Sequence, residues 1–164
     1  GTGPVGVASA VICAKAGANV TLVGRSLEKA EKIAGICNDR YDSKNVKGGA
    51  DADKSDFFNV ADIVLNTGAA GIQLMSEEHI KNSNTLKICA DTNAVPPSGI
   101  AGVDVMDNGK VIDMSPSKCL GIGALAIGNI KYKSQHECLK LMYTSEKPVY
   151  LDFEDAFKFA QKSV

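Results

Sequence analysis

The chain has 164 residues, of which 45% are hydrophobic and 23% charged, so it has the size of one compact domain with a core of its own. Its 18 Lys and Arg residues are balanced by 19 Asp and Glu residues, and this net charge of -1 removes the electrostatic basis for binding nucleic acid without sequence preference. No apolar run reaches the roughly 18 to 20 residues of a membrane span, and we expect no leader peptide. We therefore expect a cytoplasmic protein that binds neither nucleic acid nor membrane.

A glycine-rich motif stands at the start of the chain. Its G-x-G-x-x-G pattern consists of Gly1, Thr2, Gly3, Pro4, Val5 and Gly6. In a dinucleotide-binding domain this motif follows a β-strand and opens a helix. Because no strand precedes Gly1, we expect the chain to be a fragment whose first strand lies upstream. The small apolar residues 5–16 predict the helix, and Gly17 its end.

Hydrophobic periodicity and turn residues predict the remaining elements. In the first half we expect a strand at 19–24, a helix capped by Ser26 and reaching Cys37, a weaker strand at 45–50, a short helix at 53–59 and a buried strand at 62–66. In the second half we expect a helix at 73–81, a strand at 86–90, a loop at 91–102, a hairpin of strands 103–106 and 111–114 around Asn108 and Gly109, a helix at 121–143, a strand at 149–151 and a last helix capped by Asp152.

Strands and helices alternate along the whole chain without a linker or an internal repeat. This order predicts the α/β class, with a doubly wound, mostly parallel, Rossmann-like sheet that spans residues 1–164 as one domain and lacks its first strand. The five cysteines are odd in number and include no C-x-x-C pair, so we expect reduced, structural thiols and no metal site.

The glycine motif has a defined physical role in binding a dinucleotide. Its first Gly allows a tight turn, its second lets backbone N–H groups reach the pyrophosphate, and its third lets the helix pack closely on the sheet. The helix N-terminus adds partial positive charge near the phosphates. Residues 1–6 are therefore the predicted pyrophosphate site, although glycine-rich turns are common and the motif alone is a weak signal.

The residues after the strand at 19–24 predict which dinucleotide is bound. A site for NAD usually has Asp or Glu at the end of this strand, where it accepts from the ribose hydroxyls, but Gly24 stands there. Arg25, Ser26 and Lys29 follow, and together they could bind a 2'-phosphate. We therefore expect NADP rather than NAD, the alternative being that Arg25 and Lys29 are solvated surface charges.

Two further segments lie where the next strands are expected to end. Residues 67–71 (T-G-A-A-G) would leave room for the nicotinamide riboside, or would form an ordinary turn. Asp91 and Asn93 follow the strand at 86–90; either could face the cofactor, or Asn93 could brace the Pro96-Pro97 loop. His79 and His136 lie in polar surroundings and are predicted to be surface residues, and no hydrolase constellation is present.

These residues together resemble the NADP-binding domain of the methylene-tetrahydromethanopterin dehydrogenases. The segments that carry the resemblance are G-T-G-P-V-G at 1–6, V-G-R-S-L-E-K-A at 23–30, T-G-A-A-G-I-Q-L at 67–74, A-D-T-N-A-V-P-P-S-G-I-A-G-V-D at 90–104 and G-I-G-A-L-A-I-G at 121–128. The A-D-x-N-A-x-P-P pattern with a glycine-rich helix downstream is more specific than the nucleotide motif.

The resemblance implies oxidation of methylene-tetrahydromethanopterin to the methenyl form, with hydride passing to NADP. Such a transfer needs no protein nucleophile, and no catalytic residue is singled out. It implies that residues 1–6 hold the pyrophosphate and that Arg25, Ser26 and Lys29 hold the 2'-phosphate. The nicotinamide side would be bound by Thr67, Gly68, Ala69 and Asn93. It also implies an N-terminal pterin-binding domain outside this chain, homo-oligomerisation of the full-length chain, and weak cofactor binding without turnover by the fragment alone.

Three other functions remain open at the level of sequence. A methylene-tetrahydrofolate dehydrogenase would use a different pterin carrier. Another NADP reductase with a Rossmann domain, such as one of the shikimate dehydrogenase type, would use the same cofactor on a different substrate. A non-catalytic NADP-sensing module would bind nucleotide and a partner without hydride transfer.

Overall fold

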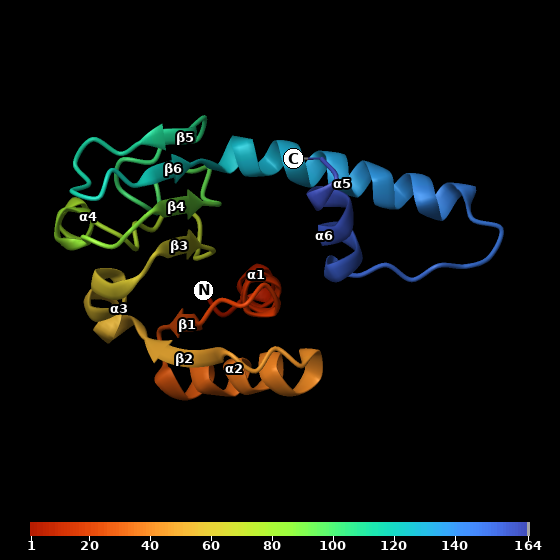
Figure 1. The fold of residues 1–164 in the computed structure, drawn as a ribbon, viewed down its shortest axis with the longest axis horizontal. Helices are drawn as coiled ribbons and strands as arrows, with labels where there is room; N and C mark the ends of the chain where they lie inside the picture. Colours follow the sequence, from red (N-terminus) through yellow and green to blue (C-terminus); the bar gives the residue numbers. More distant parts are fainter. Residues whose placement is uncertain (164) are drawn as a thin grey trace.

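The computed structural model describes residues 1–163, which fold as an α/β protein with two separate β-sheets (Figure 1). Helix α1 (Pro4–Lys15) comes first and ends before Gly17, which adopts a positive φ of 95° as predicted for a helix stop. No helix within residues 1–163 is long and apolar enough to cross a membrane.

The first sheet consists of two parallel strands joined by a helix. Strand β1 (Val20–Gly24) pairs with β2 (Val46–Ala50) in a register that places Val20 opposite Val46. Helix α2 (Leu27–Tyr41) connects them, and the Ser26 side chain caps it by accepting from the Lys29 backbone N–H at 3.3 Å. The predicted strands at 19–24 and 45–50 and the predicted Ser26 cap are confirmed.

A short 3-10 turn, η1 (Asp51–Asp53), and helix α3 (Lys54–Val60) lead into the second sheet. Its strands lie in the order β3-β4-β6-β5, with bounds β3 (Ile63–Asn66), β4 (Ile88–Asp91), β5 (Asn108–Val111) and β6 (Leu120–Ile122). The pairs β3–β4 and β4–β6 are parallel, whereas β5 is antiparallel to β6. Three of the four strand pairings within residues 1–163 are therefore parallel, as an alternating βα chain produces.

The predicted hairpin of strands 103–106 and 111–114 is wrong. Residues 103–106 form a turn, because the Asp104 carboxylate accepts from the Met106 N–H at 2.9 Å and the Asp107 carboxylate accepts from the Asp104 N–H at 2.8 Å. Asn108 and Gly109 lie inside β5, where Gly109 has a φ of 82° and the register shifts as in a β-bulge. The partner of β5 is β6 (Leu120–Ile122), so the predicted helix at 121–143 begins too early.

Two smaller expectations are also wrong. The helix expected at 73–81 begins only at Glu77, because Ser76 caps α4 (Glu77–Asn82) and Gln73 and Leu74 run extended beside Ser98 and Gly99. No strand forms at 149–151. The two last helices are confirmed as α5 (Ala124–Thr144) and α6 (Phe153–Gln161), the latter capped by Asp152.

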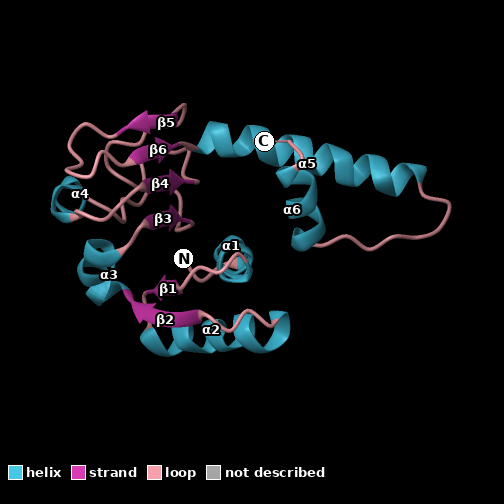
Figure 2. Ribbon diagram, viewed as in Figure 1, coloured by secondary structure: helices cyan, strands magenta, loops and turns pink. Residues whose placement is uncertain are grey.

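Helices α5 and α6 lie against each other at one end of the molecule (Figure 2). Phe153 of α6 packs edge-on against Tyr41 of α2 with ring centroids 5.3 Å apart, and Glu154 pairs with Lys15 of α1 at 2.7 Å. These contacts connect α6 to the first sheet and its helices.

Each sheet has its own hydrophobic core. One core contains Val11, Leu22 and Cys37 with neighbouring residues of α1 and α2, and the other contains Met75, Ile80 and related side chains around β4. All five cysteines are free thiols, three of them buried, as expected for structural cysteines.

Candidate functional site

The N-terminus of α1 is open towards solvent. Its N-cap is Gly3, no side chain caps the helix, and Pro4 occupies the first helical position. A Cβ built on Gly3 would meet no atom within 4 Å, so space remains in front of the helix. Unsatisfied N–H groups and the positive end of the helix dipole make this position suited to an anion such as a phosphate.

The glycine loop lies tightly against the loop that follows β3. A Cβ on Gly1 would come 2.4 Å from the Thr67 backbone oxygen, and a Cβ on Gly6 would come 1.9 Å from the Gly1 oxygen. Any side chain at either position would collide with backbone, so these glycines are needed for the close approach. The structure thus brings Gly1 and Gly6 together with Thr67, three residues predicted for the site.

The end of β1 meets the same loop. A Cβ on Gly24 would come 2.8 Å from the Thr2 methyl group. Arg25, Ser26 and Lys29 follow Gly24 and are exposed, and within residues 1–163 neither Arg25 nor Lys29 takes part in a salt bridge. The two basic side chains are therefore free to meet an anionic ligand, while the Ser26 hydroxyl oxygen also serves as the cap of α2.

Residues 67–71 form a loop held by its neighbours in the chain and in space. Thr67 and Gly68 are half-buried and Ala69 is exposed. The Gly68 N–H donates to Asn66 Oδ1 at 3.0 Å, and the Gly71 N–H donates to Asn93 Oδ1 at 3.3 Å. The part played by Asn66 is not predictable from the sequence, because its hydrogen-bond partners follow only from the fold.

Asp91, the last residue of β4, and Asn93, two residues further on, are buried rather than exposed at the rim. Asp91 is 2% exposed and Asn93 is 5% exposed. Asn93 Oδ1 accepts from the Val95 N–H at 2.9 Å, and Asn93 Nδ2 donates to the Pro97 oxygen at 2.8 Å. With its amide engaged in this way, Asn93 braces the loop, which favours an indirect part in the site.

Neither histidine lies beside these loops. His79 Nδ1 accepts from the Ser76 N–H at 3.0 Å in a capping box, and His79 Nε2 lies 3.1 Å from the Ser55 Oγ. Burial and the nearby Lys54 ammonium lower the pKa of His79, against weaker opposing effects of Glu78 and Asp51. His136 is exposed on α5, as predicted.

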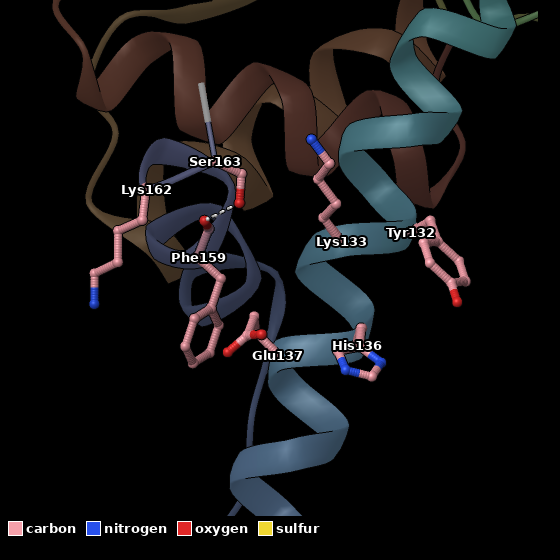
Figure 3. Close-up of a pocket in the computed structure, with 7 residues that line it drawn as sticks. All are labelled: Tyr132, Lys133, His136, Glu137, Phe159, Lys162 and Ser163. Atoms are coloured by element: carbon pink, nitrogen blue, oxygen red, sulfur yellow. Dashed lines mark hydrogen bonds between the residues drawn. The ribbon is translucent and has the colours of Figure 1, made fainter.

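A surface cavity of about 440 Å³ lies elsewhere, between α5 and α6 (Figure 3). Side chains of Tyr132 and Lys133 from α5 line it together with Phe159 of α6 and Lys162, which directly follows α6. None of the predicted site residues lines it, so the glycine-loop cluster and this cavity are separate features.

The chain matches no protein-family model. It is 38% identical over 163 residues, 98% of its length, to an NAD(P)-dependent methylenetetrahydromethanopterin dehydrogenase of Methylorubrum extorquens, and these residues make up 54% of that protein. It is also 36% identical over 149 residues to the bifunctional protein MdtA of the same organism, covering 89% of the chain and 50% of that protein. The chain therefore spans about half the length of the curated relatives it matches, and the resemblance noted in its sequence is confirmed.

Proposed function

We propose that this chain, a relative of the NAD(P)-dependent methylenetetrahydromethanopterin dehydrogenases along nearly its whole length, is the cofactor-binding domain of such an enzyme. The observation that carries the proposal is the convergence of three loops on one point. The uncapped N-terminus of α1, the basic residues after β1 and the loop after β3 meet through the contacts of Gly1, Gly6 and Gly24.

A Rossmann-like sheet is the arrangement that these features favour. In that fold the first strand of the sheet runs into the glycine loop and lies between the strands called β1 and β3 here. Those two strands are edges of separate sheets, and the amino terminus lies between them (Figure 1). A strand that leads into Gly1 would join the two sheets into one.

The residues present fit NADP. The uncapped α1 N-terminus, with open space at Gly3, would hold the pyrophosphate. Arg25 and Lys29 would hold the 2'-phosphate with the Ser26 hydroxyl, and the absence of an acid at the end of β1, where Gly24 stands, removes repulsion towards it. The relative is named as NAD(P)-dependent, so NAD is the alternative cofactor.

The proposed reaction is oxidation of methylene-tetrahydromethanopterin to its methenyl form. The bound cofactor would accept the hydride, so the chain itself would supply orientation rather than a nucleophile or a base. The loop at 67–71 would place the nicotinamide end, and the part of the protein outside these residues would supply most of the pterin site and any contact between protomers.

The test is an activity assay of the full-length protein with NADP. We expect turnover of methylene-tetrahydromethanopterin, slower turnover with NAD, and no turnover by the 164-residue chain alone, which should also bind NADP weakly. Activity only with methylene-tetrahydrofolate would indicate a folate-linked dehydrogenase. Nucleotide binding without hydride transfer from either pterin would instead indicate a different NADP reductase or a sensing module.

A further inference from the structure

A buried carboxylate connects the loop after β4 to the end of β3. Asp91 Oδ2 accepts from the backbone N–H groups of Gly99 at 2.7 Å and Ile100 at 3.0 Å. Asp91 Oδ1 accepts from Asn66 Nδ2 at 2.7 Å and from the Asn93 N–H at 3.0 Å. Four donors thus compensate for the burial of one charged group, which would otherwise be costly.

The network continues from Asp91 into the loop at 67–71. Asn66 donates to Asp91 and uses its other side-chain atom, Oδ1, to accept from the Gly68 N–H at 3.0 Å. Asn93 is held by Asp91 through its backbone and accepts from the Gly71 N–H at 3.3 Å. Both ends of this loop therefore receive their orientation from side chains that Asp91 fixes.

Two glycines show how closely the network is packed. A Cβ on Gly99 would lie 1.8 Å from Asn66 Nδ2 and 2.9 Å from Asp91 Oδ1. A Cβ on Gly68 would lie 3.1 Å from Asn66 Oδ1 and 2.5 Å from the Leu74 Cδ1 atom. The Asn66 amide is confined between two positions that accept no side chain, so its orientation has little freedom.

We propose that Asp91 and Asn66 are positioning residues that hold the loop at 67–71 in the geometry that receives the nicotinamide end of the cofactor. This role rests on the proposed function, because it presupposes that NADP binds across the three loops. Both side chains are buried, so they act through Gly68 and Gly71 rather than by touching the cofactor.

The test compares two ligands on the full-length protein. NADP reaches all three loops, whereas adenosine 2',5'-bisphosphate has no nicotinamide and needs only the residues after β1 and neighbouring contacts. In Asp91→Asn, an NH2 group replaces one carboxylate oxygen and must face N–H groups that also donate, so hydrogen bonds of the network are lost. We therefore expect NADP affinity to fall about 10-fold or more. The affinity for adenosine 2',5'-bisphosphate should stay within about 2-fold, because the Arg25 side of the site is unchanged.

The double variant Asn66→Asp/Asp91→Asn keeps the test decisive if the single variant does not fold. The NH2 group of the new amide at position 91 can donate to the new carboxylate at position 66, which still accepts from the Gly68 N–H. The oxygen of the amide at position 91 can accept from the N–H groups of Gly99 and Ile100. Only the Asn93 N–H loses its partner. We expect this variant to recover part of the NADP affinity that Asp91→Asn loses, with adenosine 2',5'-bisphosphate binding again unchanged.

Ser83→Ala is the matched control, because Ser83 is fully buried and donates to the His79 oxygen at 2.7 Å, away from both loops. This variant should lower the stability of the protein without changing the affinity for one of the two ligands more than for the other. Equal losses for both ligands in the Asp91 variants that fold, or no loss, would overturn the positioning role. Failure of the unaltered protein to bind either ligand would overturn the proposed function, and the role with it.

Discussion

Arg25 is the residue on which the choice of cofactor most depends. It is exposed, follows a strand that ends in Gly24 instead of an acid, and has no salt-bridge partner within residues 1–163. A guanidinium beside a phosphate forms charge-assisted hydrogen bonds. In the full-length protein, Arg25→Ala should therefore weaken NADP binding by about 1 to 3 kcal/mol and leave NAD binding nearly unchanged, as measured by titration of both nucleotides.

The control for this substitution is Arg40→Ala. Arg40 is equally exposed and lies near the other end of α2, about 20 Å away at 1.5 Å per helical residue. Its removal changes the net charge by the same amount and should leave both affinities unchanged. If Arg25→Ala lowered the two nucleotide affinities equally, Arg25 would not recognise the 2'-phosphate.

Single residues differ in how far the sequence predicts their roles. The Ser26 cap was predictable because its partner, the Lys29 N–H, is three residues away. The Asn66–Asp91 hydrogen bond joins residues 25 positions apart, so it follows only from the pairing of β3 with β4. Asn93 was correctly placed in the loop, but its burial depends on the path of residues 95–100 around it.

At the scale of elements, α2 lies so close to β2 that one glycine is required between them. A Cβ on Gly48 would come 2.4 Å from the Glu31 backbone nitrogen and 2.6 Å from its Cα atom. Gly48→Ala should destabilise the protein by about 1 to 3 kcal/mol or more, because backbone must move to make room. Chemical denaturation of the full-length protein would show this as a lower midpoint.

Gly35 of α2 provides the matched comparison. A Cβ there would meet nothing within 4 Å, and the residue lies inside the helix. Gly35→Ala should therefore stabilise the protein by about 0.5 to 1 kcal/mol through the higher helix propensity of Ala. The two Gly→Ala variants should shift the denaturation midpoint in opposite directions, and a shift of the same sign in both would contradict the close packing of α2 on β2 at Gly48.

The contact between α3 and α4 depends on pH through His79. The neutral ring accepts from the Ser76 N–H and lies edge-on to Phe58 at 5.1 Å, and protonation of Nδ1 would remove that acceptor. Burial and Lys54 lower the pKa of His79 in the folded state below its ordinary value of 6.5. The contribution of the neutral ring to stability is therefore complete above pH 6.5, and it is lost as the pH falls from 6.5 towards the pKa of the folded state.

His79→Gln tests this dependence, because Gln at the same position can complete a capping box without titrating. We expect the melting temperature of the unaltered protein to fall more between pH 7.5 and pH 5.5 than that of the variant. The carboxylates near His79, Asp51 and Glu78, are present in both proteins, so the difference between the two profiles isolates His79. Parallel profiles would show that protonation of His79 does not weaken the α3–α4 contact.

Elements with a strong local pattern were predicted better than those defined by tertiary contacts. Helices α1, α2, α5 and α6 follow from periodicity and caps, and β1, β3 and β4 from apolar runs. The hairpin prediction is wrong because the turn forms before the Asn-Gly pair. The carboxylates of Asp104 and Asp107 accept from backbone N–H groups of residues 104 and 106 and stabilise a turn there. The three-residue strand β6 has no periodicity of its own and forms because β4 and β5 both pair with it.

At the scale of the whole molecule, the two sheets lie on either side of a position that no strand occupies within residues 1–163. In the order β2-β1 and β3-β4-β6-β5, strands β1 and β3 each have a free edge within residues 1–163. Ile63 and Leu65 of β3 are 54% and 41% exposed, which is unusual for apolar residues of a strand beside the core. Gly1 lies against Thr67, directly after β3, and Thr2 against Gly24, at the end of β1.

A protein that includes the residues preceding Gly1 should therefore form one continuous sheet. A strand leading into Gly1 would form hydrogen bonds with the free backbone groups of both β1 and β3 and would cover Ile63 and Leu65. Burial of this apolar surface stabilises by about 25 cal/mol per Å².

Hydrogen exchange tests this pairing. Amides of β1 and β3 that are unpaired in the 164-residue chain should become protected in the longer protein, and the melting temperature of the longer protein should be higher. The amides of β5, which lies at the far edge of the second sheet, provide an internal reference and should be equally protected in both. Equal protection of β1 and β3 in the two proteins would mean that the position between the sheets is not filled by a strand from upstream.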